Sequence, residues 1–180
     1  MAYTVFESVN MASTKYAERI FDAVATTDIE NGTFGYLDGL ATGEDVTYNF
    51  KVGTKAGAQV VVVDQPAWDA DTTKITNQSK DKFIIKAGTR FRVRVVKLND
   101  EFGISIEGVT SASKDKMDVN AFVTIDSTGK LAASTSTTSS AVFEGVVMRK
   151  RTSGNTLTTA GGVTYGASKV IYEVKVKTLA

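Results

Sequence analysis

The sequence predicts a mainly β protein, either an antiparallel sandwich or a small barrel, with an N-terminal arm or short helix. Three observations predict this class. Several short segments alternate apolar and polar residues with the period of two that half-buried strands show. Turn dipeptides such as Asn31-Gly32 and Asp38-Gly39 lie between them. Hydrophobic residues make up 42% of the chain, which is sufficient for a packed core.

The first thirty residues differ from the rest, and we expect them to form a separate arm or short helix ahead of a β-rich domain at 31–180. Residues 13–25 have two interpretations. They form an amphipathic helix, in which Tyr16, Ile20 and Val24 recur at a spacing of four, or they lie extended on a partner.

Beyond residue 30, the expected strands cover residues 34–37, 46–52, 60–63, 82–86, 91–95, 102–106, 121–125, 142–148 and 169–177. The segment 60–63 consists of four valines, so we expect a strand that is buried on both faces. Pro66, the only proline, ends it. Residues 132–141 include seven Ser or Thr, and the C-terminal part from about residue 132 is either part of the domain or inserted and loosely packed.

The composition excludes most catalytic chemistry. The chain has no His and no Cys, so neither a Ser-His-Asp site nor a thiolate site can be assembled. Lys and Arg number 21 against 20 Asp and Glu, whereas nucleic-acid binders usually have a basic excess. No stretch approaches the roughly 20 apolar residues of a membrane span, and the first residues do not resemble a signal peptide. The sequence therefore predicts a soluble, non-enzymatic protein without cofactor or metal.

The candidate partner-binding residues fall into three groups. Arg90, Arg92 and Arg94 project from one face of an expected strand, where they either meet an acidic partner or form a solvated face. Trp68, in a polar loop, is an interface anchor, a sugar-stacking platform or a lid over the core. The third group is the apolar side chains of the opening arm, namely Tyr3, Val5, Phe6, Val9 and Met11.

The chain also resembles a known family in overall character. The carrying features are the opening arm at 1–11, Thr/Ser-rich loops late in the chain, and the segments Glu30-Asn31-Gly32-Thr33, Lys86-Ala87-Gly88-Thr89-Arg90-Phe91-Arg92-Val93 and Phe102-Gly103-Ile104-Ser105. With these features, most of the chain resembles the head decoration, or cement, proteins of tailed bacteriophages. No strict motif carries the resemblance.

The resemblance implies a structural virion protein that binds the outside of a phage capsid and clamps neighbouring capsomers. Its partners would be the major capsid protein and other copies of itself, in a small homo-oligomer such as a trimer, with no membrane and no specific nucleic acid. It would be made in the bacterial cytoplasm and reside on the capsid surface. The opening arm would add a strand to an exposed capsid edge.

Two other functions fit the same features. A tail-tube or tail-terminator protein is also β-rich and of this size, and it would assemble by itself into rings or tubes. A carbohydrate-binding module would use Trp68 and exposed Tyr side chains as stacking platforms.

Overall fold

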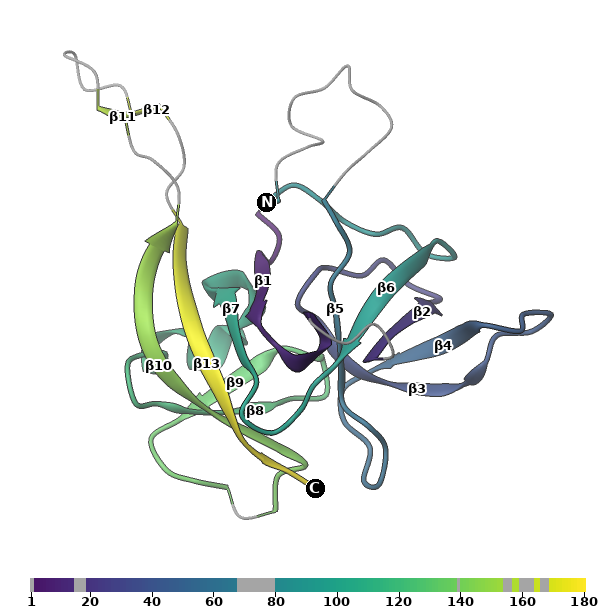
Figure 1. Ribbon diagram of the computed structural model, residues 1–180. Helices are drawn as coiled ribbons and strands as arrows, with labels where there is room; N and C mark the ends of the chain where they lie inside the picture. The colour runs from purple at the N-terminus through teal and green to yellow at the C-terminus, as the bar shows by residue number, and fades with distance from the viewer. Residues whose placement is uncertain are drawn as a thin grey trace.

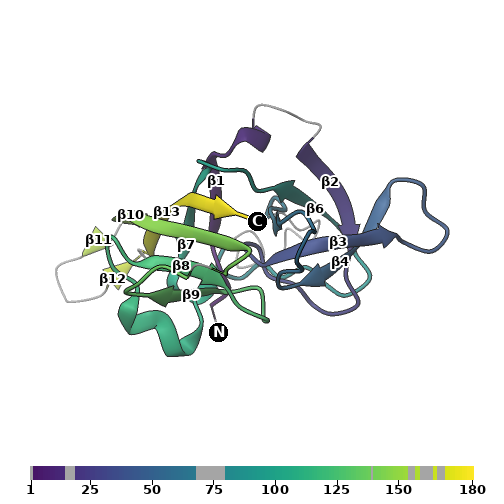
Figure 2. The same cartoon turned by 90° about the horizontal axis from the view of Figure 1, so that it is seen from below.

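The computed structural model of the protein describes residues 2–14, 19–67, 80–138, 140–153, 157–158, 164–165 and 169–180. Their main strands form a six-stranded sheet and a closed five-stranded barrel that lie side by side (Figures 1 and 2). The mainly β prediction is therefore confirmed, and the structure combines an open antiparallel sheet with a small barrel. No helix in the described part of the chain has the length and apolarity that crossing a membrane requires.

The sheet is antiparallel throughout. In spatial order its strands are β1 (Phe6–Asn10), β7 (Glu101–Ser105), β13 (Lys169–Leu179), β10 (Phe143–Ser153), β8 (Phe122–Ile125) and β9 (Leu131–Ser134). A separate pair, β11 (Leu157–Thr158) and β12 (Thr164–Tyr165), lies beyond the ends of β10 and β13 (Figure 1). Among the described residues, the 3-10 helices are η1 (Ala12–Thr14), η4 (Ile106–Gly108) and η5 (Ser111–Lys116).

The barrel is formed by the strands in the order β2 (Ile20–Val24), β4 (Thr47–Val52), β3 (Phe34–Leu40), β5 (Val61–Val63) and β6 (Arg90–Val95), with β6 closing onto β2. All its pairs are antiparallel except β2–β4, which is parallel. A parallel pair needs a long connection, because a tight hairpin can join only antiparallel strands. Here the connection from β2 to β4 contains β3.

The four valines at 60–63 connect two hydrophobic cores. Val61 and Val63 pack inside the barrel, whereas Val60 and Val62 pack in the core shared with the sheet. Phe34 of β3 also enters the shared core, where its ring centroid lies 5.4 Å from Phe102 and 5.7 Å from Phe143. The prediction of a strand buried on both faces is therefore confirmed, because one side of this barrel wall covers the sheet.

The expectation of a separate N-terminal arm or helix is wrong. β1 is paired with β7 at the edge of the sheet, and β2 is a barrel strand where the end of a helix was expected. Val5 and Phe6 are both 7% exposed, and Met11 is 2% exposed. These side chains are therefore unavailable to a partner, because all three are buried, and Phe6 and Met11 pack in the core shared by the sheet and the barrel.

Two other local expectations also fail. Residues 82–86 form only an isolated bridge, between Ile85 and Ile29, and no named strand. After residue 132, the described strands β10 and β13 are packed in the domain, because they lie in the middle of the sheet. Their side chains Val147, Ile171 and Val174 are fully buried.

Candidate functional site

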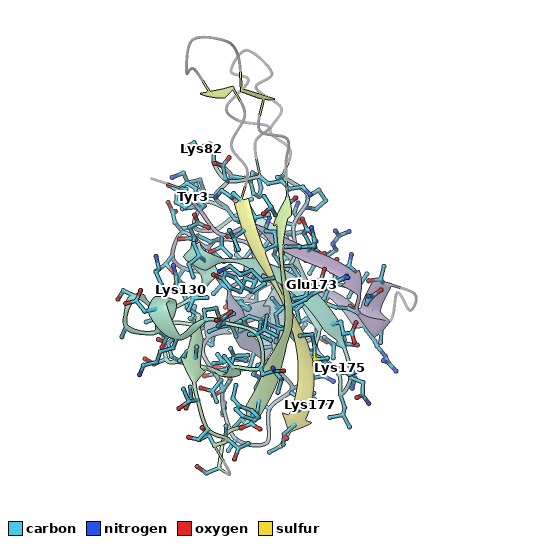
Figure 3. The ribbon with its side chains drawn as sticks, turned by 90° about the vertical axis from the view of Figure 1, so that its left-hand side faces the viewer. Tyr3, Lys82, Lys130, Glu173, Lys175 and Lys177 are labelled. Atoms are coloured by element: carbon cyan, nitrogen blue, oxygen red, sulfur yellow. The ribbon has the colours of Figure 1, made fainter. Side chains whose placement is uncertain are left out.

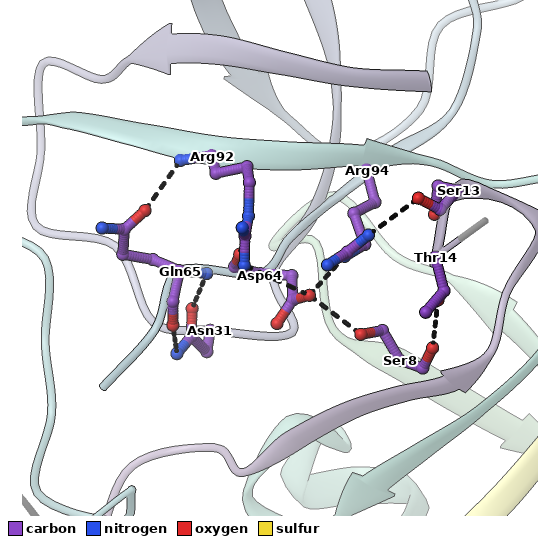
Figure 4. Close-up of polar contacts among 8 residues, drawn as sticks. All are labelled: Ser8, Ser13, Thr14, Asn31, Asp64, Gln65, Arg92 and Arg94. Carbon is purple, nitrogen blue, oxygen red and sulfur yellow. Dashed lines mark hydrogen bonds and ion pairs between the residues drawn. The ribbon is translucent and has the colours of Figure 1, made fainter. Parts of the chain in front are cut away.

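A cleft of about 570 Å³ lies between the edge of the sheet and the barrel. One wall is the stretch 4–8, which contains the start of β1. The other wall consists of β6 with the segment 64–67, which follows β5. Figure 4 shows the two walls, with β6 above and β1 below. Polar and charged side chains line much of this cleft, which makes it the leading candidate for a binding site.

Asp64 joins the two walls. Its carboxylate Oδ2 accepts hydrogen bonds from the Arg94 guanidinium on β6 and from the Ser8 hydroxyl on β1, the latter at 2.9 Å. Arg92 Nη2 lies 4.0 Å from the same oxygen, and Arg92 Nε donates to the Asp64 carbonyl at 3.0 Å. One carboxylate thus contacts two guanidinium groups on its own wall and the Ser8 hydroxyl on the opposite wall (Figure 4).

Arg94 also holds the turn that follows β1. Its Nη1 donates to the Ser13 carbonyl at 3.0 Å, and the hydroxyl of Thr14 donates to the Ser8 carbonyl at 2.7 Å. Arg94 is only 8% exposed, so its charge depends on the Asp64 carboxylate for compensation. This arrangement makes Arg94 a structural cation that fixes the end of the cleft.

A second set of hydrogen bonds fixes the wall around Arg92. The Arg92 N–H donates to Gln65 Oε1 at 3.0 Å, so the Gln65 side chain continues the ladder where β5 ends. Asn31 holds Gln65 in turn: Asn31 Oδ1 accepts from the Gln65 N–H at 2.9 Å, and Asn31 Nδ2 donates to the Gln65 carbonyl at 2.8 Å. The backbone that presents Arg92 is therefore held in place.

The N-terminal stretch before β1 is fixed by side chains from other parts of the chain. Glu30 Oε2 accepts from the Thr4 N–H at 3.0 Å and from the Thr4 hydroxyl at 2.8 Å. Ser105 Oγ accepts from the Val5 N–H at 3.0 Å. These bonds place the stretch against β7, which explains why it lies in the fold and does not extend away from it.

Glu107, beside this stretch, is held in its charged form. Lys169 Nζ lies 3.4 Å from Glu107 Oε1 and also donates to the Tyr3 carbonyl at 3.4 Å. Burial opposes the charge of Glu107. The Ser105 hydroxyl, the backbone N–H of Glu107 and the Lys169 charge outweigh it, so the pKa of Glu107 lies below its ordinary value of 4.5.

We expect Glu107→Gln to change how the free energy of unfolding depends on pH in the acidic range. A carboxyl whose pKa is lower in the folded state stabilises the fold above its unfolded pKa, and this contribution is lost as the pH falls through the folded pKa. The variant should therefore unfold about 1 kcal/mol more easily at neutral pH, and the difference should shrink below pH 4.5. Urea unfolding followed by circular dichroism across this pH range measures it.

Glu44→Gln is the matched control, because the Arg90 partner of Glu44 is 60% exposed. Exposed ion pairs contribute little, so this variant should match the wild type at every pH. If Glu107→Gln and the wild type lost stability in parallel on acidification, Glu107 would not be the group responsible.

The outer face of the sheet carries a second charged cluster. Arg151 on β10 contacts Glu7 on β1 and also Glu173 on β13, the latter through Nε at 2.7 Å, and Arg149 contacts Glu173 as well. Figure 3 views this face, with Glu173 and Lys175 labelled along β13. The Arg149 hydrogen bond, with that of Arg151, outweighs burial and lowers the pKa of Glu173. This cluster links β10 and β13 with β1, which lies on the far side of β7.

The structure separates the three predicted arginines. The side chain of Arg90 is 60% exposed and pairs with Glu44, that of Arg92 is 33% exposed, and that of Arg94 is 10% exposed. We expected the three arginines to share one solvated face, but only the Arg90 side chain is mainly exposed. Phe91, between them, lies in the barrel core as its alternation predicted.

The remaining predicted residues have different outcomes. Val5, Phe6 and Met11 are core residues, as described above, although the main chain of the first two borders the cleft. Tyr3 is half-buried and Val9 belongs to β1. Trp68 lies outside the described residues, so its predicted role stays a prediction.

Sequence reasoning did not choose Ser8 or Asp64 as partner-binding residues, although these two residues join the walls. Asp64 and Gln65 directly follow a fully buried strand, and polar side chains at such a strand end are a usable signal. Nothing in the sequence places Ser8 near them, because 56 residues separate Ser8 from Asp64.

Comparisons of the chain with protein-family models, with curated proteins and with solved structures found no match in any of the three. Within the described ranges, no group of three or more Asp or Glu side chains is arranged to hold a metal ion.

Proposed function

We propose that the protein is a structural component of a tailed-bacteriophage virion, which binds the outside of the capsid shell and clamps neighbouring capsomers. The observation that carries the proposal is the long ribbon formed by β10 and β13. Each strand has 11 residues, and they pair from Phe143 opposite Leu179 to Ser153 opposite Lys169. Eleven residues of antiparallel strand span about 37 Å.

The ribbon is fixed in the sheet over most of its length, because β13 pairs with β7 from Ile171 to Lys175. Its base is the centre of the sheet, where Val147 and Val174 are buried, and β11 and β12 lie beyond its far end, away from the barrel (Figure 1). A body that rests on one capsomer can therefore reach the next with this element. Many such weak contacts on one particle add through effective concentration, so modest affinity at each suffices. The major capsid protein is the proposed partner, and a small homo-oligomer such as a trimer would multiply the contacts.

Co-sedimentation with empty capsid shells tests the proposal. The full chain should pellet with the shells and raise the temperature at which they dissociate. A shortened variant, in which Asn-Gly replaces residues 154–168, joins the paired residues Ser153 and Lys169 by a two-residue turn. We expect it to bind the shells at least tenfold more weakly while unfolding at the temperature of the full chain.

Three results would contradict the proposal. Absence of the full chain from the pellet would exclude capsid binding. Equal binding by the shortened variant would exclude residues 154–168, which contain β11 and β12, as the reaching element. Spontaneous rings or tubes of the purified protein in electron micrographs would favour a tail-tube protein instead.

A further inference from the structure

We infer that the cleft between β1 and β6 binds an extended peptide segment of a partner protein. The segment adds as a strand to the edge of β1 that borders the cleft, and an acidic side chain of the segment pairs with Arg92. This inference goes beyond capsid binding and does not depend on it. The main chain of β1, the charges of the cleft and the rigidity of its walls each support it.

β1 has one paired edge and one edge that borders the cleft. The Ser105 N–H donates to the Val5 carbonyl at 3.0 Å, and Glu7 lies opposite Gly103, so Val5 and Glu7 use the edge facing β7. Main-chain groups of alternate residues point to opposite edges of a strand. Phe6 therefore directs its N–H and C=O toward the other edge.

The residues on either side of Phe6 agree with this assignment. The Thr4 N–H donates to Glu30, not to β7, and the Ser8 carbonyl accepts from Thr14. Five consecutive residues, 4–8, line the cleft. Consecutive side chains point to opposite faces of a strand, so a cavity that borders only one face would be lined by every second residue. Five consecutive lining residues therefore indicate that the edge of the strand borders the cleft. The Thr4 carbonyl, both groups of Phe6 and the Ser8 N–H therefore offer a two-residue ladder to an added strand.

The charges favour an acidic partner. Among the residues that the structure describes, the charged side chains that line the cleft are Glu7, Asp64, Lys80, Arg92 and Arg94. The Glu7 carboxylate is bound by Arg151 on the outer face of the sheet, and the Asp64 carboxylate is bound by Arg94. Because both of these acidic groups are paired, Arg92 and the exposed Lys80 give the described lining of the cleft an excess of positive charge.

Arg92 is suited to receive a carboxylate. Its Nε is used by the Asp64 carbonyl, but a guanidinium has five N–H donors in a fixed fork. Its Nη2 lies 4.0 Å from the Asp64 carboxylate, and a third of its side chain is exposed. A guanidinium with spare donors at the wall of a cleft can bind a carboxylate through two parallel hydrogen bonds. The hydrogen bonds of Gln65 and Asn31 fix its backbone, so binding orders little of the protein.

Synthetic peptides test the inference without any capsid. The probe is a fluorescently labelled, C-terminally amidated pentapeptide, Thr-Val-Glu-Val-Thr, compared with the same peptide carrying Lys in place of Glu. Fluorescence anisotropy with the full chain should show saturable binding of the Glu peptide, at least tenfold tighter than that of the Lys peptide. Methylation of the central peptide nitrogens should abolish binding, because the added strand loses its main-chain donors.

Variants of the protein locate the site. Arg92→Glu should weaken the Glu peptide at least tenfold and strengthen the Lys peptide. Arg90→Glu is the matched control, because Arg90 is on the same strand but pairs with Glu44 outside the cleft, and it should change neither affinity. Circular dichroism checks that both variants fold.

The inference is overturned if neither peptide binds at millimolar concentration, or if the two peptides bind equally well. Equal effects of the Arg90 and Arg92 variants would also overturn it. Displacement of the Glu peptide by a short oligothymidylate at lower concentration than by unlabelled Glu peptide would assign the cleft to phosphates of nucleic acid instead. The peptide comparison needs no variant, so a misfolded Arg92→Glu protein would not prevent the test.

Discussion

A chain that lacks residues 2–11 is expected to lose its cooperative fold. This deletion removes Val5, Phe6 and Met11 from buried positions, and burial of each such side chain contributes about 1.5–3 kcal/mol. It also leaves Glu30 and Ser105 without their hydrogen-bond donors. The total loss, about 5–10 kcal/mol, is comparable to the whole stability of a typical domain. Thermal unfolding monitored by circular dichroism should show a low or absent transition.

Asn10→Ala is the control for this deletion. Asn10 lies on the same strand but is exposed, and its contact with Glu101 is long, at 3.5 Å, so this variant should unfold like the wild type. A deleted chain with an unchanged transition would contradict the structural role of the segment. It would also restore the possibility that residues 1–11 form a free arm for a partner.

Phe34→Ala is expected to cost about 3–5 kcal/mol in the free energy of unfolding. Phe34 is fully buried, and its ring packs against Phe102 and Phe143 of the sheet, although its backbone belongs to the barrel. Its removal leaves a cavity where the two halves meet, and a packed interior closes such a cavity only partly. Urea unfolding measures the change in free energy.

Leu40→Ala provides the comparison for Phe34→Ala. Leu40 ends the same strand, β3, but is 48% exposed, so its truncation should change stability by less than about 0.5 kcal/mol. A small effect of Phe34→Ala, or two separate unfolding transitions in the wild type, would show that sheet and barrel do not share a core.

The local pattern of apolar and polar residues was sufficient to predict a strand and its buried faces in two segments. In β6, Phe91, Val93 and Val95 alternate with arginines, and these three side chains do fill the barrel. The four valines at 60–63 were also predicted correctly as a buried strand. In both segments, the pattern of side chains within the segment already determines which faces are apolar.

The sequence could not distinguish a helix from a strand at 20–24. Residues four apart share a face in a helix, but they also share a face in a strand, because four is an even number. The buried side of β2 is that of Phe21 and Ala23, which the spacing of Ile20 and Val24 does not reveal. Pairing with β6 and β4 decides the conformation, and that pairing is a property of the whole chain.

The weakest signals belonged to the edges and the cleft. β9 has small side chains such as Ala132 and Ala133, so it was not distinguished from the Thr/Ser-rich segment around it. The cleft depends on Ser8, Asp64 and Arg94, which lie far apart in the sequence and meet only after the sheet and barrel pack together. Such contacts set the geometry of the candidate site and leave no local pattern.

The most direct test of the proposed function is a cryo-electron microscopy reconstruction of capsid shells incubated with the full chain. The account predicts regular density on the outer surface, with the sheet and barrel over one capsomer and the ribbon of β10 and β13 extending onto its neighbour. Shells with a bare outer surface at saturating protein concentration, or density confined to a tail, would contradict it.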